Sequence, residues 1–139
     1  MPNPVLHVLD GTAALFRAWF AVSGRSAPDG SEVGAVWGFG QWLARVHRRL
    51  RPSHVAVVFD AGSWTFRNEI WEDYKANRGE PPEELIPQFE LAVALCGAMG
   101  CPSFRVDGYE ADDLMAALAR RGREAGISVA LITPDKDVL

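Results

Sequence analysis

The chain has 139 residues, of which 48% are hydrophobic and 23% are charged, which is ordinary for a soluble protein and enough for one domain with its own core. The net charge of −4 and the pI near 5.3 argue weakly against nucleic acid as a partner. No apolar run reaches transmembrane length and no signal peptide precedes the first predicted strand, so we expect a cytoplasmic protein without a membrane partner. Two cysteines are too few for a disulfide framework, so we expect both thiols to be buried and reduced.

The first part of the chain predicts the order strand, helix, helix, strand. Residues 5–9 form a short apolar run of β-branched or large side chains, which indicates a buried strand. A Gly-Thr pair then breaks the run and offers a cap for a helix over about residues 13–20. Apolar residues recur at spacings of three and four over about residues 33–50, and Pro52 stops this second helix. Residues 55–59 are the second predicted strand.

The second part of the chain continues this alternation after an irregular segment. Residues 61–80 mix aromatic and basic side chains and show neither a clean strand period nor that of a buried helix. Prolines then open a helix over about residues 83–99, which has apolar side chains on one face. A strand over residues 103–106, a helix over residues 109–125 and a strand over residues 127–133 complete the chain.

This alternation predicts an α/β fold. Strands that are separated by helices imply right-handed crossovers and a mostly parallel, twisted sheet with helices on both faces, in a three-layer, Rossmann-like arrangement. We expect residues 1–139 to form a single domain, since no linker, repeat or low-complexity tract divides them. In such sheets, ligands bind beyond the carboxyl ends of the strands.

Acidic residues follow each of the four predicted strands. A lone aspartate after a strand is usually a turn former or a helix cap, but three acids at the start of the helix over residues 109–125 exceed what capping needs. Parallel strands would bring all these carboxylates to one edge, where bound cations relieve their repulsion, and hard oxygen ligands suit Mg²⁺ or Mn²⁺. The predicted metal ligands are Asp10, Asp60, Glu110, Asp112, Asp113, Asp135 and Asp137. The sequence therefore predicts a metal site for phosphate chemistry.

Basic residues near this site would hold a phosphate. In the segment over residues 61–80, Arg67, Lys75 and Arg78 can offset the charge that develops on a phosphate beside the metal pocket. Tyr74 can stack on a base, whereas the neighbouring tryptophans and phenylalanine are equally explained as a packed lid. If metal neutralises the seven carboxylates, basic residues outnumber the remaining acids, since the chain has 14 basic and 18 acidic residues.

A second basic cluster lies at the end of the helix over residues 33–50. It consists of Arg45, His47, Arg48, Arg49 and Arg51. The cluster has two interpretations: contact with a nucleic-acid backbone, or cations that stabilise the C-terminal end of a helix. We favour the second interpretation.

Six short strings, spread over essentially the whole chain, carry a resemblance to a known family. They are Leu9-Asp10-Gly11, Val58-Phe59-Asp60, Phe66-Arg67, Tyr74-Lys75-Ala76-Asn77-Arg78, Gly108-Tyr109-Glu110-Ala111-Asp112-Asp113 and Asp135-Lys136-Asp137. In this order they resemble the 5′-nuclease family, which includes the 5′–3′ exonuclease domain of bacterial DNA polymerase I and the flap endonucleases. The fourth and fifth strings are the most specific.

The resemblance implies a PIN-like fold with two divalent ions, Mg²⁺ or Mn²⁺, held by the seven carboxylates. It also implies a helical arch over about residues 61–83, with Tyr74, Lys75 and Arg78 in the arch and Arg67 at its base. Family members cut DNA near 5′ ends and at flap junctions, and they also cut RNA in RNA–DNA hybrids.

The chain departs from the family in two respects. Pro134 stands where members usually carry Gly or Ala, and proline removes an N–H and stiffens the turn before Asp135. The family also continues into a helix–hairpin–helix region that grips duplex DNA, preceded by further aspartates for the second metal, and the 139 residues do not contain this region. We expect the chain to be the N-terminal half, with a C-terminal half that is missing or separate.

The sequence thus predicts a metal-dependent 5′–3′ exonuclease and flap endonuclease that hydrolyses DNA phosphodiesters by in-line attack. The residues expected to carry the reaction are Lys75, Arg78, Asp10, Asp112 and Asp135. Two alternatives stay open: a PIN-type ribonuclease, which shares the acidic strand ends, and a non-catalytic nucleic-acid-binding remnant or subunit.

Overall fold

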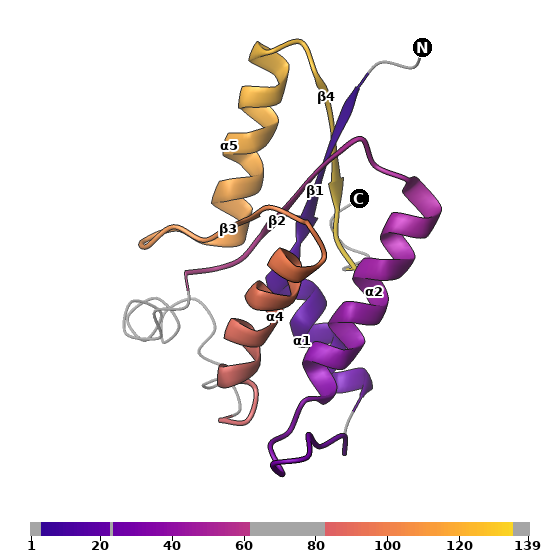
Figure 1. The fold of residues 1–139 in the computed structure, drawn as a ribbon. Helices are drawn as coiled ribbons and strands as arrows, with labels where there is room; N and C mark the ends of the chain where they lie inside the picture. Colours follow the sequence, from indigo (N-terminus) through magenta and orange to yellow (C-terminus); the bar gives the residue numbers. More distant parts are fainter. Residues whose placement is uncertain (1–3, 23, 62–82, 135–139) are drawn as a thin grey trace.

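A computed structural model describes residues 4–22, 24–61 and 83–134, and its strands and helices alternate along the chain (Figure 1). The elements are β1 (Val5–Asp10), α1 (Gly11–Ala21), α2 (Gly34–Leu50), β2 (His54–Val58), α4 (Ile86–Ala98), β3 (Ser103–Phe104), α5 (Ala111–Glu124) and β4 (Ser128–Ile132). Within these described ranges, no helix is long and apolar enough to cross a membrane.

The described strands form one parallel sheet in the order β3-β2-β1-β4. In this sheet Asp10, the last residue of β1, is level with Val58, the last residue of β2. The carboxyl ends of the two central strands therefore meet at one edge, and the predicted α/β class with a parallel sheet is confirmed.

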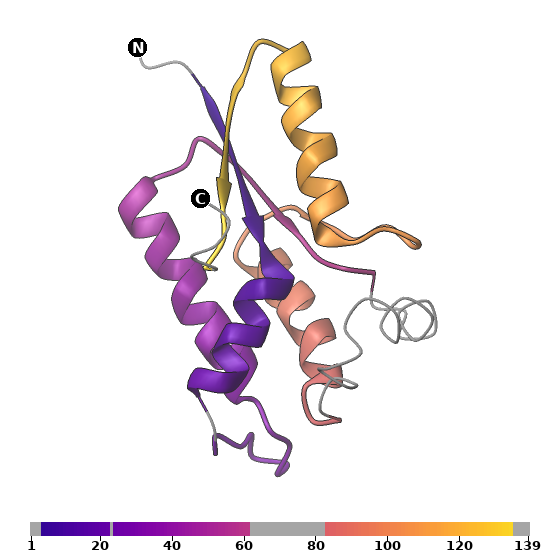
Figure 2. The same ribbon diagram turned by 180° about the vertical axis from the view of Figure 1, so that it is seen from behind.

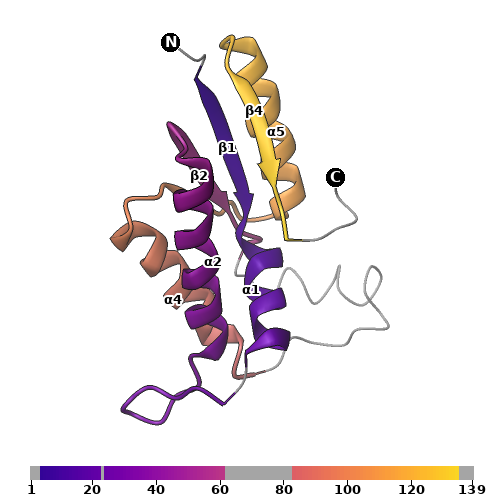
Figure 3. The same ribbon diagram turned by 90° about the vertical axis from the view of Figure 1, so that its right-hand side faces the viewer.

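Helices cover both faces of this sheet, as Figures 2 and 3 show from two further sides. Neighbouring residues of the central strands point to opposite faces. Leu9 and Val57 belong to the core with α1, α2 and α4, whereas Val8 and Val58 pack with α5. The three layers that the alternation predicts are therefore present.

A buried glutamine joins the two long helices of the first face. Gln88 of α4 is fully buried, and its Oε1 accepts the Val36 N–H at the start of α2 over 2.9 Å. Its Nε2 donates to the Glu84 carbonyl over 3.0 Å, so both ends of the side chain are satisfied. The Gly34 N–H donates to Glu32 Oε1 over 3.1 Å. These two acceptors cap α2, whose own N-cap residue supplies no side-chain hydrogen bond.

The two cysteines are buried around the end of α4. Gly100 adopts the left-handed φ of 74° that favours glycine, and the Cys101 N–H donates to the Cys96 carbonyl over 2.8 Å, which closes the helix. Burial raises the pKa of the Cys96 thiol to about 12 and also raises that of Cys101. Both cysteines are buried and not bonded to each other, so the predicted burial of the two thiols is confirmed.

The end of β3 and the start of α4 are among the predicted boundaries that were wrong. β3 has two residues where residues 103–106 were predicted, because the chain then turns at Gly108, whose φ is 87°. α4 begins at Ile86 where residue 83 was predicted, since residues 83–85 form a turn and Pro87 occupies the first helical turn without an N–H to donate.

Candidate active site

Asp10 is held where β1 passes directly into α1. It is the N-cap residue of α1, and its Oδ1 accepts the Ala13 N–H over 3.0 Å. The cap that the sequence placed at Gly-Thr is thus Asp10. Gly11 allows the junction to lie against the core, because a Cβ there would lie 2.6 Å from Phe59 Cε1. Asp10 is only 8% exposed, so it is nearly buried at the carboxyl end of β1.

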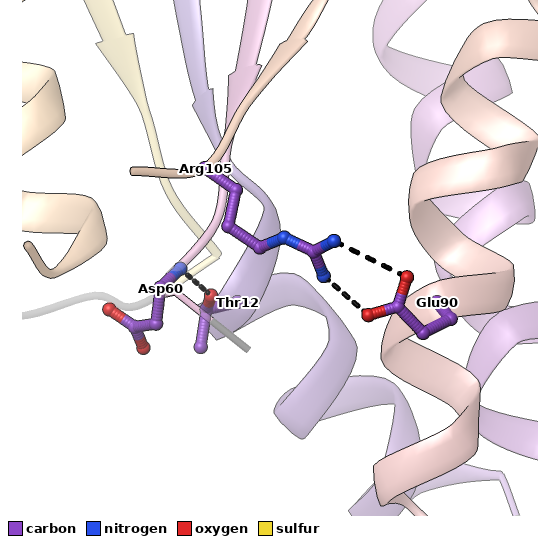
Figure 4. Close-up of polar contacts among 4 residues, drawn as sticks. All are labelled: Thr12, Asp60, Glu90 and Arg105. Carbon is purple, nitrogen blue, oxygen red and sulfur yellow. Dashed lines mark hydrogen bonds and ion pairs between the residues drawn. The ribbon is translucent and has the colours of Figure 1, made fainter. Parts of the chain in front are cut away.

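Asp60 follows β2 and is held from two sides. Its backbone N–H donates to Thr12 Oγ1 over 2.8 Å, as Figure 4 shows. Its Oδ1 accepts the Ala111 N–H over 2.7 Å, at the first residue of α5. Asp60 is 8% exposed, and its carboxylate lies at the N-terminal end of α5. Asp60 therefore joins α1, β2 and α5 at one point.

The acids at the start of α5 serve partly as caps. Glu110 is the N-cap residue, and its N–H donates to the Asp113 Oδ2 over 3.0 Å in a capping box. Asp112 and Asp113 lie in the first turn and are exposed. The inference that three acids exceed what capping needs was too strong for Asp113, because Glu110 and Asp113 cap each other's backbone N–H groups.

Two further residues hold this edge together, and the sequence did not single them out as site residues. Thr12 is 7% exposed and accepts the Asp60 N–H, as described above. Arg17 of α1 donates from Nη1 to the carbonyl of Pro134, which is the residue before Asp135. The only sequence signal for either is its place within one or two helical turns of Asp10.

An ion pair ties the chain after β3 to α4. Arg105 Nη1 lies 2.6 Å from Glu90 Oε1, and Nη2 donates to Oε2 over 3.3 Å (Figure 4). The two bonds link the chain between β3 and α5 to the side of α4. The pair is exposed, so its contribution to stability is small.

The structure brings Asp10, Asp60 and the acidic start of α5 to the same edge of the sheet. Their carboxylate oxygens are the donors that Mg²⁺ and Mn²⁺ prefer, so the donor chemistry fits such an ion. Among residues 4–22, 24–61 and 83–134, however, no three His, Cys, Asp or Glu side chains form a group that could hold a metal ion. Asp135 and Asp137 lie outside these ranges, and the seven-ligand set stays a prediction.

The predicted phosphate-binding residues also lie outside the described ranges. They are Arg67, Tyr74, Lys75 and Arg78, together with nearly all of the predicted arch over residues 61–83. Their roles stay predictions.

Comparison with known proteins places the chain in a family. The family model described as the 5′-3′ exonuclease, N-terminal resolvase-like domain matches residues 5–139. The chain is 43% identical over 141 residues to DNA polymerase I of Chloroflexus aurantiacus, covering 100% of the chain and 15% of the polymerase. It is 41% identical over 144 residues to the 5′-3′ exonuclease of Bacillus subtilis, covering 100% of the chain and 48% of that relative. The chain thus spans at most about half the length of these relatives.

Solved structures share the fold. A bacteriophage T5 D15 flap endonuclease, in a complex with DNA and metal ions, has a TM-score of 0.61 and 26% identity, with 95% of this chain and 49% of that chain covered. A zinc-bound T5 5′-exonuclease has a TM-score of 0.66 at 24% identity, with 96% and 50% covered. The predicted PIN-like fold and the predicted family resemblance are confirmed. The chain belongs to the family of 5′-3′ exonuclease N-terminal resolvase-like domains.

Proposed function

We propose that the chain is the N-terminal catalytic half of a metal-dependent 5′–3′ exonuclease and flap endonuclease that hydrolyses DNA phosphodiesters. The observation that carries this proposal is that hydrogen bonds hold Asp10, Asp60 and the start of α5 at the same edge of the sheet. A relative named as a 5′-3′ exonuclease matches the whole chain at 41% identity, and this favours a DNA nuclease over a PIN-type ribonuclease.

The carboxylates would bind two divalent ions, Mg²⁺ or Mn²⁺. The proposed ligands are Asp10, Asp60, Glu110, Asp112, Asp113, Asp135 and Asp137. When bound, such ions stabilise the attacking and leaving oxygens of an in-line displacement. The contribution of this chain is to hold Asp10 and Asp60 in fixed positions through Ala13, Thr12 and Ala111, so that the ligands need little rearrangement.

The segment over residues 61–83 would bind the substrate. Lys75 and Arg78 would neutralise the scissile phosphate, Arg67 would bind the backbone, and Tyr74 would stack on a base. The substrates would be DNA with 5′ ends or flaps, and RNA–DNA hybrids. A C-terminal half with a helix–hairpin–helix region would grip the duplex, in keeping with the chain's share of about half of the B. subtilis relative.

Replacement of Lys75 tests the proposed substrate contact. We expect Lys75→Ala to cut cleavage of a 5′-flap substrate by about two to three orders of magnitude, the scale for loss of one preorganised charge stabiliser. Metal affinity should barely change, because Lys75 is not a proposed ligand. Turnover is measured with the chain alone and with a helix–hairpin–helix half supplied, and Arg105→Ala, which removes an exposed cation paired with Glu90, is the matched control.

Three results would argue against the proposal. If Lys75→Ala cleaves normally while Asp112→Asn is inactive, the arch assignment is wrong and the PIN-type ribonuclease moves ahead. Cleavage of RNA alone would have the same consequence. DNA binding without turnover at any metal concentration, with the C-terminal half supplied, would show a non-catalytic binding protein.

A further inference from the structure

Exposed arginines gather at the edge of the sheet that lies opposite the carboxylates. Both α2 and α5 end where the strands begin, on opposite faces of the sheet (Figures 1 and 3). The group, here called the arginine edge, consists of Arg45, Arg48, Arg49, Arg51, Arg120, Arg121 and Arg123. All seven side chains are exposed.

The strand register places the two helix ends at the same end of the sheet, one on each face. α2 leads within a few residues to His54 at the start of β2, and α5 leads to Ser128 at the start of β4. His54 is level with Leu6 and Ser128 with Val5 of the intervening β1, so these two starts lie roughly 10 Å apart at about 4.8 Å per strand. The last turn of α5 also lies directly on β4, because a Cβ at Gly122 would come within 2.3 Å of Val129 Cγ2.

The seven arginines differ from the other arginines that the structure describes. Arg17 binds the Pro134 carbonyl, Arg25 stacks on the Trp37 ring at 3.7 Å, and Arg105 pairs with Glu90. Within residues 4–22, 24–61 and 83–134, no ion pair or side-chain hydrogen bond involves an arginine of the arginine edge. Glu124 is the one acidic residue in the second half of α2 or of α5. The edge is therefore a cationic surface whose charge is largely uncompensated.

The helix dipole explains only part of this surface. A cation in the last turn of a helix contributes about 0.3–1 kcal/mol, and the effect fades beyond that turn. Arg48, Arg49, Arg121 and Arg123 lie in last turns, but Arg45, Arg51 and Arg120 do not. Arg51 also adopts a left-handed φ of 44°, where glycine is less strained. The planar, five-donor guanidinium suits phosphate oxygens.

We propose that the arginine edge binds the sugar–phosphate backbone of duplex DNA without reading its sequence. It would give the chain a second DNA contact, on the far side of the sheet from the cleavage site. This contact lies outside the proposed cleavage site, and it rests on the proposed function only in that DNA is taken as the polyanion. The charge distribution supports it, because a protein with a net charge of −4 can bind DNA only where its cations are gathered.

Duplex binding as a function of salt tests the proposal. Fluorescence anisotropy of a labelled blunt duplex is measured with the full chain in EDTA, which prevents cleavage, between 50 and 200 mM salt. We expect R48Q/R49Q/R121Q/R123Q to weaken binding at low salt by roughly tenfold to a hundredfold. The log–log salt slope should fall by about 3 to 4, because each phosphate that a cation neutralises contributes about 0.9 to that slope. R48Q/R49Q should lose roughly half of that slope.

The matched control for R48Q/R49Q is R25Q/R105Q, which also removes two exposed arginines. Its affinity should stay within about twofold of the wild type, because the net charge changes by the same amount but neither arginine belongs to the arginine edge. Thermal unfolding of each variant separates binding from helix stability. Unchanged duplex affinity in the quadruple variant, with or without a lower Tm, would overturn the proposal and leave the helix-dipole explanation. Tighter binding to anionic lipid vesicles than to the duplex would overturn it in favour of a membrane surface. Cleavage of a 5′-flap substrate in Mg²⁺ is a separate readout, so failure of the cleavage proposal is seen apart from failure of duplex binding in EDTA.

Discussion

Replacement of Asp60 with asparagine is expected to reduce metal-dependent cleavage on the order of a thousandfold while the fold is kept. The asparagine Oδ1 can still accept the Ala111 N–H, and the backbone bond from residue 60 to Thr12 does not depend on the side chain. The substitution therefore removes the negative charge of residue 60 and keeps these two hydrogen bonds. The loss follows because a neutral amide is a weaker ligand for a hard divalent ion than a carboxylate.

Initial rates on a 5′-flap substrate, with Mg²⁺ and the C-terminal half supplied, measure this effect. The matched control is Asp29→Asn, the same change at an exposed loop position where the side chain accepts hydrogen bonds from Ser31. Circular dichroism should show both variants folded. Equal rates for Asp60→Asn and Asp29→Asn would show that Asp60 takes no part in the chemistry.

Gly11→Ala is expected to lower the free energy of unfolding by about 2 kcal/mol, which corresponds to a fall in Tm of roughly 5–10 °C. The added Cβ would lie 2.6 and 2.7 Å from Phe59 ring atoms and 2.9 Å from Val57 Cγ1. Both neighbours belong to the buried core, so neither can move away cheaply. The gain from alanine over glycine in a helix, about 1 kcal/mol, is too small to offset this overlap.

Urea unfolding of the two variants Gly11→Ala and Gly97→Ala isolates the overlap. Gly97 also lies in a helix, but a Cβ there meets nothing within 4 Å. Gly97→Ala should be neutral or slightly stabilising. If both variants unfold at the same urea concentration, the close approach of Gly11 to Phe59 does not limit the junction between β1 and α1.

The fold was largely predictable because its signals are local. Apolar runs and their spacing gave every described strand and helix, and alternation gave the parallel sheet with helices on both faces. The errors lie at the ends of elements, where short-range turn geometry decides. Gly108 turns the chain away after β3, and the turn before Ile86 delays α4.

The candidate site was predictable in part. Topology alone placed Asp10, Asp60 and the acids of α5 at one edge. The bonds that fix them were not predictable, because they join residues far apart in sequence: Thr12 and Asp60 are 48 positions apart, and Arg17 and Pro134 are 117 apart. The capping box of Glu110 and Asp113 had a local signal, because the two acids are three positions apart. The prediction overlooked this signal when it treated all three acids as more than capping needs.

Thermal unfolding of the full chain with and without Mn²⁺ tests most directly whether the edge binds metal. Because an ion that binds only the native state stabilises it by about 2.7 kcal/mol at a hundred times its Kd, Mn²⁺ should raise the Tm of the wild type and of Asp29→Asn. We predict no such rise in the double variant Asp112→Asn/Asp135→Asn, in which two of the seven proposed ligands are neutral. An equal rise in the wild type and the double variant would contradict a carboxylate metal site at this edge.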